Sequence, residues 1–264
     1  MTHQIGGYRI VTHLGRGYQA DTFKIKYGTN GHRHAALKQF RPDAYKSQTL
    51  LANEYKSLMR LRKDSKPSSI PGILHYSARG RYIIMEYVSG RPMVVPRDKR
   101  RAFLWWFGLA ETIIYAHDQG VFHCDINPTN VLVNGDAVVL IDWASSKRAR
   151  SLINSSKGLP RGQWQPPEQP AGQLSRKTDI FSLAAMLLWL ISGYKPRDPI
   201  FQGPDRRGKQ IIKSVLEKSL KNTDCRSLAA CLEKGLAGDP RLRYSSAKRL
   251  YNSVRTWYRR YYQS

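Results

Sequence analysis

Cysteines and long apolar runs are scarce in this chain, and each scarcity excludes a class of protein. The three cysteines form no Cys-x-x-Cys pair and no even set, so we expect neither a cysteine metal clip nor a disulfide framework. The most apolar stretch, residues 180–191, is too short to span a bilayer and is interpreted as a buried helix that Asp179 opens and Ser192-Gly193 closes. The first residues contain no signal-peptide run. These absences predict a cytoplasmic protein without a transmembrane segment.

Acidic residues are also few, because 19 Asp and Glu stand against 44 Lys and Arg, which gives a net charge of +25. The basic excess is spread along the chain and is not concentrated in one tail. Residues 143–167 contain no acid at all. The basic residues of that stretch are Lys147, Arg148, Arg150, Lys157 and Arg161. The positive electrostatic field of so many basic residues attracts polyanions and acidic partners, and salt weakens the attraction.

The most informative segment follows residue 122 and reads His-Cys-Asp-Ile-Asn-Pro-Thr-Asn. It places Asp125 and Asn130 on one loop, and Asp142 comes after two aliphatic, β-branched runs separated by Asn134-Gly135. Asn-Gly between such runs predicts a hairpin, which would bring Asp142 back beside Asn130. Two carboxylates and a carboxamide at this spacing suit phosphoryl transfer. One Asp orients the attacking hydroxyl or accepts its proton, and the other two groups hold magnesium on the nucleotide phosphates.

These segments resemble the catalytic and metal-binding loops of eukaryotic-type protein kinases, His-Arg-Asp…Asn and Asp-Phe-Gly, and the resemblance extends over nearly the whole chain. It implies an α+β fold of two lobes within one kinase domain, residues 1–264. The small lobe, about residues 1–88, would hold an antiparallel β-sheet and one helix, and the larger lobe, about 89–264, would be mainly helical. The resemblance also implies ATP and Mg²⁺ as cofactors, Asp125, Lys38 and Glu54 as catalytic residues, and Asn130 and Asp142 as metal ligands.

The small lobe carries further nucleotide motifs. A glycine-rich hairpin is expected around Gly15 and Gly17, and Ala-Ala-Leu-Lys ending at Lys38 matches the family's Val-Ala-Ile-Lys strand. Glu54 lies in a segment with helical periodicity, and a Lys38–Glu54 pair would hold the lysine on the α- and β-phosphates. Met85 would be the gatekeeper. The cofactor-binding set implied by the resemblance is Leu14, Gly15, Gly17, Thr22, Ala36, Lys38, Met85, Glu86, Val88 and Leu132.

Within that set, the implied roles differ. Leu14, Thr22, Ala36 and Leu132 would sandwich the adenine ring, while the backbone of Glu86 and Val88 would meet its polar edge.

Two distant motifs test the whole resemblance. Trp-Gln-Pro-Pro-Glu, ending at Glu168, resembles the family's Ala-Pro-Glu, and Asp-Pro-Arg-Leu-Arg, ending at Arg243, resembles its Asp-Pro-x-x-Arg. The resemblance implies a buried Glu168–Arg243 ion pair.

One departure from the family pattern bears on regulation. Cys124 stands where many kinases have an arginine that needs a phosphorylated activation loop to neutralise it. Without that arginine, phosphate on the loop has less leverage, so activity independent of loop phosphorylation is expected. The serines concerned are Ser145, Ser146, Ser155 and Ser156. His123, which precedes Cys124, is expected to hold the loop and the Asp142 region together.

Other departures concern the phosphate site. Asn127 replaces the lysine that helps neutralise the γ-phosphate in Ser/Thr kinases, and Arg161 is a candidate for the missing cation. Ala20 takes the place of the third glycine of the hairpin. Trp143-Ala144 replace Phe-Gly: the Trp can still pack against the small-lobe helix, whereas Ala restricts a backbone rotation that glycine allows. None of these changes removes a residue that would bind metal or accept the proton.

Three interpretations compete. The first is an ATP-dependent protein kinase that acts on Ser or Thr of protein substrates, with acidic proteins as candidates. The alternative is a pseudokinase that serves as a basic scaffold for nucleic acid, other polyanions or an acidic protein partner. A small-molecule phosphotransferase is disfavoured by the peptide-docking motifs at Glu168 and Arg243. Tyr specificity stays open, since Asn127 matches neither pattern and Trp164 resembles what tyrosine kinases often have there.

The last residues, 251–262, interleave arginines with aromatic residues. This composition suits weak nucleic-acid binding, but a final amphipathic helix whose rings pack onto the large lobe is the favoured interpretation. Loops are expected at residues 44–47, 63–71, 91–101 and 145–161.

Overall fold

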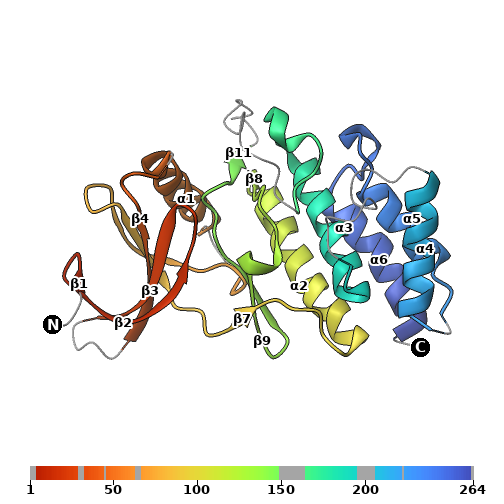
Figure 1. The fold of residues 1–264 in the computed structure, drawn as a ribbon, viewed down its shortest axis with the longest axis horizontal. Helices are drawn as coiled ribbons and strands as arrows, with labels where there is room; N and C mark the ends of the chain where they lie inside the picture. Colours follow the sequence, from red (N-terminus) through yellow and green to blue (C-terminus); the bar gives the residue numbers. More distant parts are fainter. Residues whose placement is uncertain are drawn as a thin grey trace.

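The structure is a computed structural model and describes residues 4–28, 33–44, 46–62, 67–148, 164–194, 206–221 and 223–262. Two lobes lie side by side, a sheet lobe from the first part of the chain and a helical lobe from the rest (Figure 1). The predicted α+β, two-lobed fold is confirmed. The connection between the lobes follows strand β6 (Tyr82–Glu86) and leads into the short strand β7 (Arg91–Pro92).

The small lobe is an antiparallel sheet with one helix against it. The strand order is β1-β2-β3-β4-β6-β5, and neighbouring strands are antiparallel. Its other strands are β1 (Gln4–Ile5), β2 (Tyr8–Arg16), β3 (Ala20–Tyr27), β4 (Arg33–Phe40) and β5 (Ile73–Ser77). Helix α1 (Ser47–Leu61) buries Leu51, Leu58 and Leu61 on one face, as their spacing predicts. Glu54 lies on the same buried face, so a carboxylate is turned inward.

The large lobe is built around helix α3 (Arg176–Ser192), in which residues 178–191 are all buried. The expected buried helix is confirmed, although it begins three residues before Asp179. Ser175 caps it in a capping box with Thr178, and Gly193 ends it with a φ of 77°. The surrounding helices are α2 (Lys99–Asp118), α4 (Arg206–Ser219), α5 (Arg226–Gly235) and α6 (Ala247–Tyr262).

The aromatic residues near the end of the chain pack inward. On α6, Trp257 and Tyr258 are buried, and their ring centroids lie 5.4 Å and 5.2 Å from that of Phe103 on α2. Arg255, Arg259 and Arg260 of the same helix are exposed. The amphipathic-helix interpretation is therefore confirmed for the rings.

Three of the expected loops contain regular structure, and in 44–47 this is only Ser47, the first residue of α1. The prediction for residues 91–101 holds for residues 93–98 and is wrong at both ends, because β7 opens this stretch and α2 begins at Lys99. The Asp98 carboxylate accepts hydrogen bonds from the backbone N–H groups of Arg100 and Arg101 there. In residues 145–161, strand β11 (Lys147–Arg148) pairs with β8 (Val121–Phe122). Residues 149–161 lie outside the described residues. Within the described chain, no helix combines the length and apolar character needed to cross a membrane.

Candidate active site

A hairpin in the large lobe brings the predicted oxygen-bearing side chains together. Strands β9 (Val131–Asn134) and β10 (Ala137–Leu140) pair in register from Asn134 opposite Ala137, and Gly135 takes a φ of 59° in the turn. The return strand leads to Ile141, whose backbone N–H donates to the Asn130 carbonyl at 2.8 Å. Asp142 therefore follows immediately beside Asn130, as the Asn-Gly pattern predicts.

Asn130 also joins the loop to Asp125. Its Nδ2 donates to Asp125 Oδ2 at 3.0 Å and to the Asp125 carbonyl at 2.9 Å. The short 3-10 turn η1 (Pro128–Asn130) is held by Asn127, whose Oδ1 accepts the backbone N–H groups of Thr129 and Asn130. Asn127 is thus occupied as a cap, and its amide donates back to the Asp125 carbonyl at 3.1 Å.

Asp125 sits in an environment that favours its neutral form. Burial, with a further contribution from the nearby charge of Asp142, raises its pKa to about 7, and the hydrogen bonds from Asn130, Asn127 and Gln165 only partly offset this rise. A carboxylate with a pKa near neutrality can exchange a proton close to physiological pH.

Lys38 links the two lobes through a pair of carboxylates. Its Nζ lies 2.9 Å from Glu54 Oε2 on α1 and 2.8 Å from Asp142 Oδ1, so the expected Lys38–Glu54 pair is present. Burial alone would lower the lysine pKa, but the charges of Asp142 and Glu54 raise it above its ordinary value. Lys38 in turn outweighs the effect of burial on Asp142 and lowers its pKa, whereas burial keeps the pKa of Glu54 raised. The cluster therefore holds a permanently charged lysine.

Buried hydrogen bonds fix the backbone immediately before Asp125. Asp179 on α3 accepts the backbone N–H groups of His123 at 2.8 Å and Cys124 at 2.7 Å, and lies 2.8 Å from His117 Nε2. Cys124 needs this support because its φ is 63°, a left-handed conformation uncommon outside glycine. Asp179 on α3 therefore holds the backbone of the loop that carries Asp125. The sequence pattern had suggested only that it opens a helix.

His123 has the structural role that its position suggests. Its Nε2 lies 3.2 Å from the Ile141 carbonyl, and its Nδ1 accepts the Asp125 N–H at 3.2 Å. Burial lowers the pKa of the imidazole. A neutral ring protonated at Nε2 satisfies both contacts, so His123 connects the Asp125 loop to the residue before Asp142. The Trp143 ring packs on it edge-on, with centroids 4.7 Å apart.

The segment after Asp142 is fastened to helix α1 by residues that sequence reasoning missed. Asn53 Nδ2 donates to the Ala144 carbonyl at 2.6 Å and the Ser146 carbonyl at 2.7 Å. Ser146 is fully buried, and its hydroxyl is 2.6 Å from the Ser57 hydroxyl. Asn53 directly precedes Glu54 on the helix, which is the one local signal that could have pointed to it.

The glycine-rich hairpin forms between β2 and β3. Gly15 pairs with Thr22 across the strands, and the Gly17 N–H donates to the Ala20 carbonyl at 2.8 Å. A Cβ at Gly17 would lie 3.1 Å from that carbonyl oxygen, a tight contact that favours glycine there. Arg41, which sequence reasoning also missed, donates from its guanidinium to the carbonyls of Gly17 and Tyr18 at the tip.

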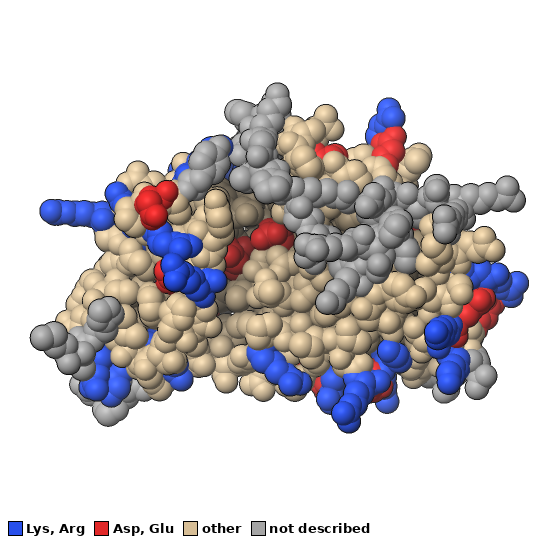
Figure 2. Space-filling view, viewed as in Figure 1, with Lys and Arg blue, Asp and Glu red and all other residues tan. Residues whose placement is uncertain are grey.

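The residues predicted to hold an adenine ring come from both lobes. Ala36 pairs with the buried Met85 across β4 and β6, and Leu132 lies on β9 in the large lobe. Glu86 is exposed, and its carboxylate accepts a hydrogen bond from the Gly72 N–H at 2.7 Å. Of the remaining three, Leu14 on β2 is exposed, whereas Thr22 on β3 and Val88 beyond β6 are half-buried. In Figure 2, acidic side chains lie at the bottom of a hollow between the lobes.

The distant ion pair is present as well. Arg243 is buried and reaches the Glu168 carboxylate with two nitrogens, at 2.7 Å and 2.9 Å. The same guanidinium donates to the carbonyls of Lys177 and Ala237, so its charge is well satisfied. Arg161, the candidate for an additional cation, lies outside the described residues.

The donor set suits magnesium bound together with phosphate oxygens. Mg²⁺ commonly takes one or two protein oxygens and completes its shell with water and substrate phosphates. The Asp142 carboxylate and the Asn130 carboxamide supply such oxygens, and Lys38 beside them can contact phosphate. Among the described residues there is no cluster of three or more His, Cys, Asp and Glu side chains that would form an all-protein metal cage.

Comparison with known proteins agrees with this geometry. The sequence model of the family described as "Protein kinase domain" matches residues 8–253. Serine/threonine-protein kinase D of Synechocystis sp. is 25% identical over 94% of this chain and 51% of its own length. Serine/threonine-protein kinase PknA of Nostoc sp. is 23% identical over 94% of the chain and 46% of its own length. The chain thus spans about half the length of these curated relatives.

A solved structure gives the same fold. The crystal structure of the Mycobacterium tuberculosis PknI kinase domain superimposes with a TM-score of 0.68 at 20% identity, covering 97% of this chain and 98% of the other. At this identity the likeness concerns the fold alone.

Proposed function

The chain belongs to the protein kinase domain family, and on this premise we propose that it transfers the γ-phosphate of ATP to Ser or Thr hydroxyls of protein substrates. The observation that carries the proposal is the Lys38 cluster, in which one buried lysine lies within 3 Å of both Glu54 and Asp142. The relatives named above are serine/threonine-protein kinases, which supports Ser or Thr as acceptors. We take residues 1–264 as one kinase domain whose lobes divide near Val88.

The proposed mechanism is direct in-line transfer, in which the protein positions the groups and stabilises charge. When bound, MgATP supplies the phosphoryl group and a cation that neutralises its oxygens. Asn130 and Asp142 would hold that cation. Lys38, braced by Glu54, would orient the phosphates, and Asp125 would position the acceptor hydroxyl and accept its proton. Asn130 keeps Asp125 aligned through the hydrogen bond at 3.0 Å.

The adenine and phosphate contacts are proposed on the same basis. The ring would lie between Leu14, Thr22 and Ala36 on one side and Leu132 on the other, with Met85 at the back. The backbone of Glu86 and Val88 would meet its edge, and Gly15 and Gly17 would lie over the phosphates.

Arg41 is added to this set as a positioning residue, because its hydrogen bonds to the carbonyls of the hairpin tip restrain the loop.

We further propose that activity does not require phosphorylation of the activation segment. Cys124 brings no cation for a phosphate to neutralise, and burial raises its thiol pKa well above the ordinary value. Asn53 and Ser57 already hold the start of the segment with neutral hydrogen bonds, and Ser146 is buried among them. Ser155 and Ser156 lie outside the described residues. Loss of turnover after phosphatase treatment would contradict this part of the proposal.

The basic surface supports acidic protein substrates, or weak binding of polyanions, as partners. A pseudokinase scaffold that uses this surface without phosphoryl transfer is the second candidate function, favoured by the charge of +25 and by Asn127 in place of a lysine. The deciding experiment incubates radiolabelled ATP and Mg²⁺ with acidic and generic protein substrates, comparing wild type with Asp125→Ala and Asp142→Ala. We expect label with the wild type alone. Equal label in all three proteins would support the scaffold.

A further inference from the structure

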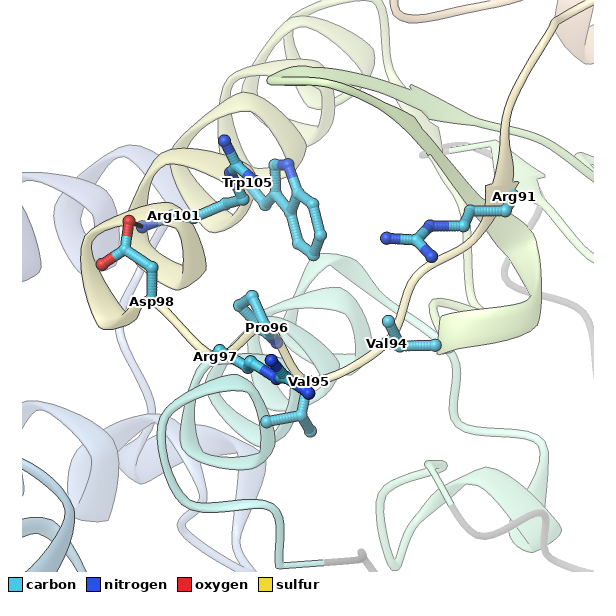
Figure 3. A pocket seen from close by; sticks show the side chains of 8 residues that line it. All are labelled: Arg91, Val94, Val95, Pro96, Arg97, Asp98, Arg101 and Trp105. Atoms are coloured by element: carbon cyan, nitrogen blue, oxygen red, sulfur yellow. Dashed lines mark hydrogen bonds between the residues drawn. The ribbon is translucent and has the colours of Figure 1, made fainter.

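A cavity of about 330 Å³ lies on the edge of the large lobe, beside the connection between the lobes and the start of α2 (Figure 3). Trp105 forms one wall. The indole is 3% exposed, and its Nε1 donates to the Gly135 carbonyl at 2.9 Å, so the ring is fixed in place. Val94 and Pro96 line the cavity from the connecting segment. Val94 is 46% exposed, which leaves apolar surface open to a ligand.

Arginines surround this apolar surface. Figure 3 shows the Arg91 guanidinium projecting toward the Trp105 ring from across the opening, and Arg97 on the connecting segment. Neither Arg91 nor Arg97 has an acidic partner within the described part of the chain. Arg101 lies 3.4 Å from Asp136, but both side chains are more than half exposed, so this pair is weak.

The one carboxylate that lines the cavity does not neutralise these arginines by direct pairing. Asp98 accepts the backbone N–H groups of Arg100 and Arg101 at 2.9 Å and 3.3 Å, as the cap of α2. Three arginines therefore line a cavity with a single, already hydrogen-bonded acid. Basic side chains also gather along the lower edge of the molecule in Figure 2, where Figure 1 places the start of α2.

The cavity is separate from the nucleotide site. On the β7–β9 pair, Arg91 lies opposite Val133, and Pro92 lies opposite Leu132. Successive residues of a strand point to opposite faces, so Arg91 and Leu132 are on different sides of this ladder. Leu132 belongs to the proposed adenine pocket, whereas Arg91 belongs to the cavity. A substitution at Arg91 can therefore be tested apart from nucleotide binding.

We propose that this cavity is a docking site for an acidic peptide segment of a protein partner, with one bulky aliphatic side chain flanked by carboxylates. The aliphatic side chain fills the space against Trp105, Val94 and Pro96. The flanking carboxylates pair with Arg91 and Arg97, whose planar guanidinium groups match carboxylate geometry. A volume of about 330 Å³ is at the lower end of ligand pockets, which suits one side chain and its neighbours.

The test uses a fluorescein-labelled peptide with a Glu-Asp-Leu-Asp-Glu core and no Ser, Thr or Tyr, so that binding is read by anisotropy without phosphoryl transfer. The double variant Arg91→Glu/Arg97→Glu is expected to weaken binding by about tenfold or more at physiological salt. Val94→Asp should weaken it as well. The matched control, Arg100→Glu/Arg249→Glu, makes the same change in net charge at exposed positions that do not line the cavity, and should change affinity by less than about threefold.

Each contrary result has a defined meaning. Equal losses in the two double variants would show that only the general basic field attracts the peptide, and would overturn the proposal. So would the absence of binding by the wild type, or equal affinity for a peptide with Gly in place of Leu. Tighter binding of a single-stranded oligonucleotide, with the same dependence on Arg91 and Arg97, would assign the cavity to nucleic acid instead. Unchanged MgADP affinity and urea unfolding of the variants verify that they are folded.

Discussion

The Lys38 cluster and the arginine-lined cavity beside Trp105 arrange charge in opposite ways. Around Lys38, the buried ammonium group is bonded to the buried Glu54 at 2.9 Å and to the half-buried Asp142 at 2.8 Å. Around Trp105, the arginines are exposed, and Arg91 and Arg97 have no close acidic partner in the described chain. Burial makes an unpaired charge costly, so the first cluster must be compensated within the protein. Exposure removes that requirement, and the second cluster is left free for charges on another molecule.

The same contrast predicts how substitutions behave. Removing one member of the buried cluster should disturb both stability and catalysis, because its partners lose their compensation. Removing an exposed arginine should leave stability nearly unchanged and affect only binding. Substitutions in and around the buried Lys38 cluster should differ widely in the size of their effect.

The largest effect is expected for Lys38→Met. The variant leaves Glu54, which is fully buried, without its cation, so it should lower the free energy of unfolding by about 2–4 kcal/mol. It should also lower kcat/KM by more than about 100-fold, since the charge that orients the phosphates is lost. Urea unfolding and initial rates measure the two quantities. Lys26→Met, an exposed position on β3, is the control. Similar stability losses in both variants would remove the distinction between buried and exposed charge.

A smaller, pH-dependent effect of opposite sign is expected for Asp125→Asn without nucleotide or metal. The folded protein holds the pKa of Asp125 at about 7, against an ordinary value near 3.8. Between these values the folded state keeps a proton that the unfolded state has released, so wild-type stability falls as the pH rises. The variant lacks this group. As the pH rises from 5 to 8, its free energy of unfolding should increase by about 1–2 kcal/mol relative to that of the wild type. This is less than the full difference between the two pKa values would give.

Urea unfolding at both pH values, in EDTA, measures that difference. Asp136→Asn is the control, because it makes the same chemical change at an exposed carboxylate in the β9–β10 turn. A constant difference between Asp125→Asn and wild type across the range would mean that Asp125 is ionised throughout, and that its burial is less costly than inferred.

Much of this arrangement could be predicted from the sequence, because the decisive signals are local. Asn134-Gly135 between two β-branched runs indicates the hairpin that returns Asp142 to Asn130. The spacing of apolar residues in residues 47–61 places Glu54 on the inner face of α1. The fold class followed from such motifs. The overlooked start of α2 also had a local signal, since Asp98 is a favourable N-cap.

The contacts that escaped prediction join residues far apart along the chain. Asn53 meets Ala144 and Ser146 across about ninety positions, and Asp179 meets the backbone of Cys124 across more than fifty. Both use a polar side chain to satisfy backbone groups of an irregular segment. Apart from the position of Asn53 directly before Glu54, nothing in the neighbouring sequence distinguishes these two side chains from ones that face solvent. The arginine-lined cavity is different, because all the residues that line it lie between Arg91 and Trp105. It escaped prediction because residues 91–101 were expected to form a loop.

The smallest effect in this series is expected for Asn53→Ala, which tests whether the activation segment is held by neutral bonds. The substitution leaves the Lys38 cluster intact but removes the donor to the Ala144 and Ser146 carbonyls. We expect a stability loss of about 1 kcal/mol, typical of lost hydrogen bonds to backbone groups. Because the segment's position depends on these bonds, kcat should fall several-fold while KM for ATP changes little. Asn252→Ala, exposed on α6, is the control. Unchanged kcat in Asn53→Ala would place the restraint elsewhere, in Ser57 or in the β8–β11 pairing, whereas a fall that phosphorylation of the segment restores would contradict independence from phosphate.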